Sequence, residues 1–146
     1  MKSQDPPIEL LQPIVNLFTN GNFQQALSNS RQMLEKFPNS VILCNIVGIS
    51  NAGLMQFEDA INSYKKAIKI NPDYAEAYYN MGIALKEKGD PKAAIESYKH
   101  AIRIKPDYTD AYSNTSEVYE NSNKLAELSE VISIGLLFTS EAPKNY

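Results

Sequence analysis

Apolar residues recur every three or four positions through most of the chain, which is the spacing of one face of an α-helix. In 75–104 they form two groups, one over about Ala75–Glu87 and one over about Lys92–Ile104. Gly89, between the groups, suits the left-handed residue that ends a helix, and Pro91 suits a first helical turn. The alternation of apolar and polar residues that is typical of strands is absent from the sequence. The pattern therefore predicts an all-α chain made of short helix pairs.

The helix-pair pattern repeats every 34 residues, as the positions of Pro38, Pro72 and Pro106 illustrate. Alignment of 41–74 with 75–108 needs no gap and gives 13 identities in 34 positions. A period of this length is typical of solenoids that stack one helix pair on the next. We therefore expect a single domain, 1–146, an αα-superhelix of four antiparallel helix pairs over 7–40, 41–74, 75–108 and 109–142.

Glycine and tyrosine keep fixed places within the repeats. Gly48 and Gly82 fall inside first helices, where each costs about 1 kcal/mol relative to alanine. Small residues at these places would let the two helices of a pair approach closely. Tyr64 and Tyr98, on the second helices, would then fill the neighbouring hole.

Three departures from the pattern need separate expectations. Met55 stands where Gly21 and Gly89 end the first helices of their repeats, so that turn is less well explained. Pro13 lies inside the first helix and predicts a kink or a late start there. The last repeat, 109–142, lacks the small residues of the others, and we expect it to be a degenerate cap.

The pattern resembles the tetratricopeptide repeat family through Gly82, Ala94, Tyr98, Ala101 and Pro106, together with their counterparts in 41–74. In character it is similar to the superhelix of bacterial proteins like the O-linked N-acetylglucosamine transferase. The resemblance implies a scaffold for protein–protein contact, with the first helices lining a concave groove that holds a peptide or a partner helix. It brings no catalytic residues, cofactor or metal.

Periodicity selects the side chains that would line such a groove, because they lie opposite the packed side of each first helix. The lining is expected to be apolar at the N-terminal end and acidic at the C-terminal end, in line with repeat net charges of 0, 0, +1 and −5. The expected groove residues are Asn45, Ile49, Glu76, Tyr79, Asn80, Ile83, Lys86, Ser113, Asn114 and Glu117.

Asn80 and Asn114 are one period apart and would project the same way. Amides carry a donor and an acceptor, so repeated amides can grip an extended peptide backbone, as the asparagine ladder of the transferase superhelix does. The alternative is that both are tolerated polar residues on a solvated face. On the ladder interpretation, replacing both with alanine, or replacing Tyr79, is expected to weaken ligand binding and to leave stability nearly unchanged. Cations of the kind that bind a terminal carboxylate in chaperone-binding repeats are absent, so a basic or apolar peptide suits the groove better.

An apolar strip in the first repeat allows two interpretations. Ile8, Leu11, Val15 and Phe18 could form a self-association surface, which would make the protein a homodimer or an oligomerisation scaffold. Alternatively, the strip is packed inside the domain. The sequence leaves both open.

Composition narrows the function classes. The net charge of −3 lacks the basic footprint of a nucleic-acid binder. Apolar runs are too short for membrane insertion. One cysteine, Cys44, and one histidine, His100, are too few for a metal site. We therefore expect a non-catalytic, cytoplasmic interaction module. The alternative is a substrate-recruiting or regulatory N-terminal region of a larger enzyme, such as a glycosyltransferase or sulfotransferase.

Overall fold

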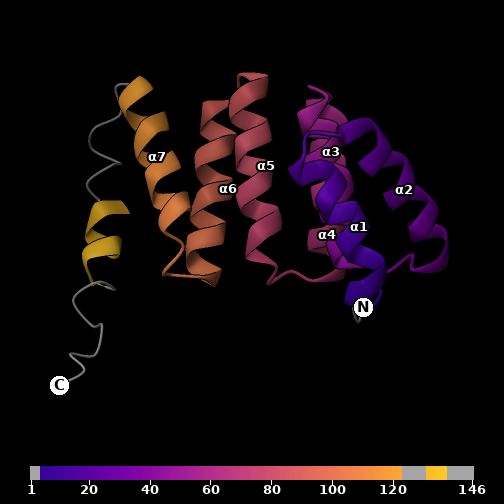
Figure 1. Ribbon diagram of the computed structural model, residues 1–146. Helices are drawn as coiled ribbons and strands as arrows, with labels where there is room; N and C mark the ends of the chain where they lie inside the picture. The colour runs from indigo at the N-terminus through magenta and orange to yellow at the C-terminus, as the bar shows by residue number, and fades with distance from the viewer. Residues whose placement is uncertain (1–3, 123–130, 138–146) are drawn as a thin grey trace.

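The computed structural model describes residues 4–122 and 131–137, and every regular element in them is an α-helix (Figure 1). This confirms the predicted all-α solenoid. The helices follow one another in pairs joined by short turns, and a short helix over 131–137 comes last. Their bounds are α1 Ile8–Thr19, α2 Phe23–Lys36, α3 Val41–Gly53, α4 Phe57–Ile70, α5 Ala75–Lys88, α6 Pro91–Ile104 and α7 Thr109–Asn121.

The pairs stack side by side from α1 and α2 at one end to α7 at the other (Figure 1). Each helix packs against the next along the chain, and the first helices also contact one another, α1 against α3 and α3 against α5. The first helices therefore form one continuous row, which brings residues about one repeat apart into contact.

Left-handed residues end the first helices at the three equivalent turns. Gly21 has φ 80°, Gly89 has φ 93°, and Met55 has φ 60°. Met55 thus takes the conformation that glycine takes in the other two repeats, although a side chain there is strained. A side-chain cap marks the start of α3, where the Ser40 hydroxyl accepts a hydrogen bond from the Leu43 N–H.

In the two middle repeats, a tyrosine of the second helix fills a hole left by a glycine of the first helix. Tyr64 and Tyr98 are buried, at 2% and 0% exposure. A Cβ placed on Gly82 would lie 2.5 Å from the Tyr98 ring, and one on Gly48 would meet the Tyr64 ring in the same way. The expected close approach of the helices is therefore present in both middle repeats.

The N-terminal apolar strip lies mostly inside the domain, which favours internal packing over self-association, the two interpretations that the sequence left open. Leu11 is 4% exposed and shares a core cluster with Leu43 and Ile46 of α3. Val15 and Phe18 are half-buried against the same cluster, while Ile8 stays 63% exposed. The physical reason is that α1 packs on α3 as well as on α2, so its apolar side is covered by its own chain.

Pro13 does not delay the first helix, because α1 begins at Ile8, ahead of the proline. The missing Pro13 N–H leaves the carbonyl of Glu9 without its helical donor. Both residues are exposed, so water can bond that carbonyl instead. Of the two alternatives predicted for Pro13, a kink or a late start, the structure excludes the late start.

The fourth repeat, predicted over 109–142, is described only for α7 and 131–137. In it the glycine and the tyrosine exchange helices: Gly135 belongs to the last helix and faces Tyr112 of α7. A Cβ on Gly135 would lie 3.4 Å from the Tyr112 ring, which is an ordinary contact. The last pair is therefore less tightly interlocked than the middle two.

Substituting Gly82→Ala should lower the free energy of unfolding by about 1–3 kcal/mol, measured by urea denaturation. The new methyl group would overlap the Tyr98 ring, which is fully buried and has no room to move. The gain in helix propensity, about 1 kcal/mol, offsets only part of the overlap. Gly135→Ala is the control and should be neutral or slightly stabilising, so equal losses in both variants would contradict the interlock.

Substituting Met55→Gly should raise the free energy of unfolding by about 1 kcal/mol, because glycine adopts positive φ without a Cβ clash. Met55 is 76% exposed, so little packing is lost with its side chain. Gly89→Ala should lower the free energy by a similar amount at the equivalent turn. Thermal denaturation in which Met55→Gly melts below the parent protein would refute this account of the turn.

Candidate functional site

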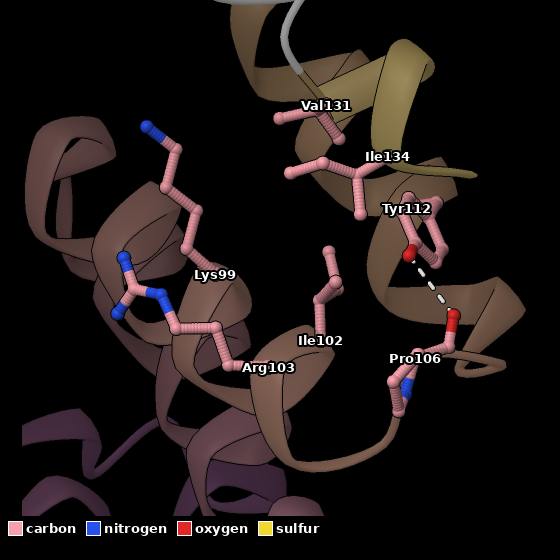
Figure 2. A pocket seen from close by; sticks show the side chains of 7 residues that line it. All are labelled: Lys99, Ile102, Arg103, Pro106, Tyr112, Val131 and Ile134. Carbon is pink, nitrogen blue, oxygen red and sulfur yellow. Dashed lines mark hydrogen bonds between the residues drawn. The ribbon is translucent and has the colours of Figure 1, made fainter. Parts of the chain in front are cut away.

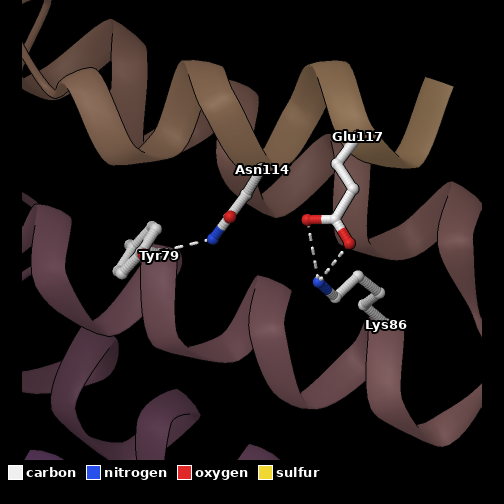
Figure 3. A network of polar contacts seen from close by, with 4 residues as sticks. All are labelled: Tyr79, Lys86, Asn114 and Glu117. Atoms are coloured by element: carbon white, nitrogen blue, oxygen red, sulfur yellow. Dashed lines mark hydrogen bonds and ion pairs between the residues drawn. The ribbon is translucent and has the colours of Figure 1, made fainter. Parts of the chain in front are cut away.

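The predicted groove residues lie together on α5 and α7, with two more on α3. Half-exposed side chains of α5 and exposed or half-exposed side chains of α7 face one another (Figure 3). On α3, Ile49 is half-buried and Asn45 is only 7% exposed. We call the following set the α5–α7 face: Glu76, Tyr79, Asn80, Ile83, Lys86, Asp110, Ser113, Asn114 and Glu117.

Both predicted amides are held by the preceding repeat. Nδ2 of Asn80 donates to Oδ1 of Asn45 at 3.0 Å, and Nδ2 of Asn114 donates to the Tyr79 hydroxyl at 3.0 Å. Each pair is separated by 35 residues, so the same contact between successive first helices is made twice. The amides are therefore not freely solvated side chains.

The contact between the first two repeats has the same spacing but is apolar. Leu11 and Ile46 are also 35 residues apart, and both are buried in one cluster. Ile46, which interrupts the predicted row of amides, thus makes a hydrophobic contact with the preceding repeat in place of a hydrogen bond. Between α3 and α5 the contact is polar, where Asn80 meets Asn45.

An ion pair links α5 to α7 beside the second amide. Nζ of Lys86 lies 3.4 Å from Oε1 of Glu117, with side-chain exposures of 25% and 55% (Figure 3). A pair this exposed contributes little to stability. It holds the one lysine of the α5–α7 face against a carboxylate, so the positive charge of that lysine is locally neutralised.

Tyrosine rings form the wall of the face next to the amides. The Tyr79 ring lies 4.8 Å from that of Tyr108 and 6.0 Å from that of Tyr98. Burial, together with the Asp110 carboxylate, raises the pKa of Tyr79. Burial and the Glu76 carboxylate raise the pKa of Tyr74 to about 12. These phenols remain neutral near pH 7 and act as hydrogen-bonding groups.

Carboxylates dominate the charge of the α5–α7 face. Asp110 and Glu117 are exposed and Glu76 is half-exposed, and exposed Glu120 follows on α7. Lys86 supplies the face's positive charge and is already paired with Glu117. The resulting potential attracts cations and disfavours anionic ligands.

The sequence predicted the residues of this face but not the hydrogen bonds that Asn80 and Asn114 make with Asn45 and Tyr79. Asn45 occupies the position in its repeat that Tyr79 occupies in the next, yet each accepts a hydrogen bond from the following repeat. The two partners of each hydrogen bond are 35 residues apart, one more than the 34-residue period. The meaning of this offset is clear only once the stacking of the repeats is known.

Sequence reasoning also missed a cavity of about 300 Å³ between α6, α7 and 131–137 (Figure 2). Its residues belong partly to the degenerate last repeat, where the 34-residue pattern does not identify packing positions.

Within 4–122 and 131–137, no group of three or more His, Cys, Asp and Glu side chains is placed to hold a metal ion. None of the helices in that part of the chain has the length and apolar character to cross a membrane.

Two protein-family models match the middle of the chain. The model described as "TPR repeat" matches residues 56–89, and the one described as "Tetratricopeptide repeat" matches residues 75–108. A relative in Arabidopsis thaliana, a probable UDP-N-acetylglucosamine–peptide N-acetylglucosaminyltransferase, is 34% identical over 74 residues. That match spans 51% of this chain and 8% of the transferase.

Solved structures share the fold over most of the chain. A crystal structure of MamA superposes with a TM-score of 0.79 at 26% identity, covering 90% of this chain and 77% of MamA. The first TPR of Spaghetti (RPAP3), bound to the HSP90 peptide SRMEEVD, superposes with a TM-score of 0.74 at 17% identity. It covers 80% of this chain and 93% of that one.

Substituting Asn80→Ala should lower the free energy of unfolding by about 1 kcal/mol, because the buried Asn45 oxygen loses its donor. Asn114→Ala should have a similar effect. The two hydrogen bonds argue against the expectation that these substitutions, or one at Tyr79, leave stability nearly unchanged. Urea denaturation measures the loss, and Asn62→Ala, on the exposed side of α4, is the control. Equal stability of the Asn80 and Asn62 variants would show that the amide contact contributes nothing.

Proposed function

We propose that this chain, a tetratricopeptide repeat protein, is a protein-interaction module that holds an extended basic or apolar peptide against its α5–α7 face. The observation that carries the proposal is the pair of amides, Asn80 and Asn114, each fixed by one hydrogen bond to the preceding repeat. A fixed amide at a constant pitch suits recognition of a peptide backbone, whose donors and acceptors also recur regularly.

The fixed amides retain hydrogen-bonding capacity. A carboxamide has two N–H donors and an oxygen with two lone pairs, and the contacts with Asn45 and Tyr79 use one N–H of each amide. Both side chains are half-exposed, so the remaining groups are within reach of a ligand. Because each amide is already oriented, binding costs less side-chain entropy than it would for a free asparagine.

The charge of the face selects the ligand's side chains. Glu76, Asp110 and Glu117 surround the amides, while Lys86 is paired with Glu117. Lysine or arginine side chains of a bound peptide would meet these carboxylates, whereas an acidic peptide would be repelled. Tyr79 and Ile83, both half-buried, offer apolar contact between the charged positions.

The comparison with the HSP90-peptide complex supports peptide binding as a use of this fold, and the ligand proposed here differs in charge. The peptide in that structure carries acidic residues at its C-terminal end. This chain has carboxylates and one paired lysine on its α5–α7 face, so we propose a basic ligand.

A second candidate role is recruitment of a substrate or regulator within a larger enzyme. The match to the Arabidopsis transferase favours it, because that relative is an enzyme and the matched part is a small fraction of its length. In that case the peptide held on the α5–α7 face would belong to the substrate of the enzyme.

Replacing Asp110→Lys together with Glu120→Lys should weaken binding of a short fluorescein-labelled peptide of lysine, leucine and serine by about tenfold at low salt. Both residues are exposed, so the fold should tolerate the change. Fluorescence anisotropy measures the affinity.

The matched control for this experiment is Glu35→Lys with Asp59→Lys, which gives the same change in net charge on exposed positions of α2 and α4. It should retain the parent affinity. Equal losses in the two double variants would mean that net charge alone governs binding. Tighter binding of the corresponding glutamate peptide would contradict the proposal outright.

A further inference from the structure

A second surface of the molecule has the opposite character to the α5–α7 face. The cavity of about 300 Å³ between α6, α7 and the helix over 131–137 is walled by apolar side chains, with two cations at its rim (Figure 2). Its lining consists of Ile102, Pro106, Tyr112, Val131 and Ile134 together with Lys99 and Arg103.

Among the polar groups of this lining, the side chains of Lys99 and Arg103 are the ones that can select a ligand by its charge. The Tyr112 hydroxyl donates to the Pro106 carbonyl at 2.9 Å, which fixes the ring as a wall (Figure 2). Among the described residues, those that line this cavity include no carboxylate, and Asp107 lines the adjoining cavity. Arg103 is exposed, and Lys99, one helical turn away on α6, adds a second positive charge. Lys99 already lies 4.0 Å from Glu96, an exposed ion pair of small energy.

The volume limits what the cavity can hold. It lies at the lower end of the range of small-molecule sites, which is about 300–1,000 Å³. A bulky aliphatic or aromatic side chain fits such a space, whereas the long acyl chains of a lipid do not. A ligand that fits both features has an apolar group for the cavity and a carboxylate for the neighbouring cations.

The surface beside the cavity indicates a partner larger than a small molecule. On the helix over 131–137, Ile132, Leu136 and Leu137 are 47%, 63% and 64% exposed. A second cavity, of about 350 Å³ and lined partly by Ile132 and Leu136, adjoins the first through Val131. Exposed apolar residues gathered beside an apolar cavity are typical of a surface that another polypeptide covers.

We infer that this cavity and the apolar surface beside it are a docking site for an acidic segment of a partner protein. The segment inserts one apolar side chain into the cavity and places a neighbouring carboxylate on the Arg103 guanidinium. This site is separate from the α5–α7 face and takes a ligand of opposite charge, so one molecule can hold two different segments at once.

The test uses a short fluorescein-labelled peptide in which a central leucine is flanked by glutamates. Two comparison peptides replace either the leucine with serine or the glutamates with glutamine. Fluorescence anisotropy should show binding of the first peptide and weaker binding of both comparison peptides. Arg103→Gln should weaken binding about tenfold, as expected for loss of a charge-assisted hydrogen bond.

Lys69→Gln is the matched control, because Lys69 is exposed on α4 at the position equivalent to Arg103 one repeat earlier. It should change the affinity less than about twofold, which is within the small effect of an exposed charge. Ile134→Phe, which reduces the cavity, should also weaken binding, with circular dichroism confirming that the variant is folded. Arg103 is exposed, so its substitution should not disturb the fold. The comparison of Arg103→Gln with Lys69→Gln therefore tests the site even if Ile134→Phe does not fold.

Several results would overturn the inference. Absence of binding at millimolar protein, or equal losses in Arg103→Gln and Lys69→Gln, would exclude the cavity as the site. Saturable binding of octanoate without binding of the peptide would assign the cavity to a small amphiphilic acid. Displacement of the acidic peptide by the lysine-containing peptide would show a single shared site, whereas simultaneous binding supports two.

Discussion

The fit of a tyrosine ring into a glycine gap is the contact on which the rest of the structure depends. Tyr64 and Tyr98 occupy the space that a Cβ on Gly48 or Gly82 would need, so the two helices of each middle pair stand closer than ordinary side chains allow. This spacing fixes how one pair stacks on the next. It therefore also fixes which residues of successive first helices meet, including the contacts that hold Asn80 and Asn114.

Much of the fold could be predicted from the sequence, because it depends on signals within one repeat. The helix pairs followed from apolar spacing, and the turns at Gly21, Met55 and Gly89 from their common place in the period. Met55 shows how strong this constraint is, since a strained φ is tolerated where neighbouring repeats use glycine.

Contacts between repeats could not be predicted, because they depend on the rise and rotation from one pair to the next. The spacing of 35 residues for amide contacts is one example. Leu11 is another: periodicity placed it on the row of first helices, but the contact of α1 with α3 buries it. The cavity beside 131–137 arises where the repeat pattern fades, so no periodic signal indicated it.

The arrangement gives one small domain two surfaces of opposite charge. The α5–α7 face is acidic and carries oriented amides, and the end cavity is apolar with Lys99 and Arg103 at its rim. A solenoid suits this division, because each repeat contacts only its neighbours and its exposed residues can vary independently. If both proposals hold, one molecule would bring two polypeptides together.

The central claim is that Asn80 and Asn114 hold the backbone of a bound peptide, and the side-chain amide signals of these residues test it most directly. In ¹⁵N-resolved NMR titrations with the lysine-containing peptide, the side-chain NH₂ resonances of both residues should shift in proportion to occupancy. Those of Asn62 on α4 should stay in place. Saturation of binding with both resonances unmoved would show that the peptide lies elsewhere, and the account of the α5–α7 face would be wrong.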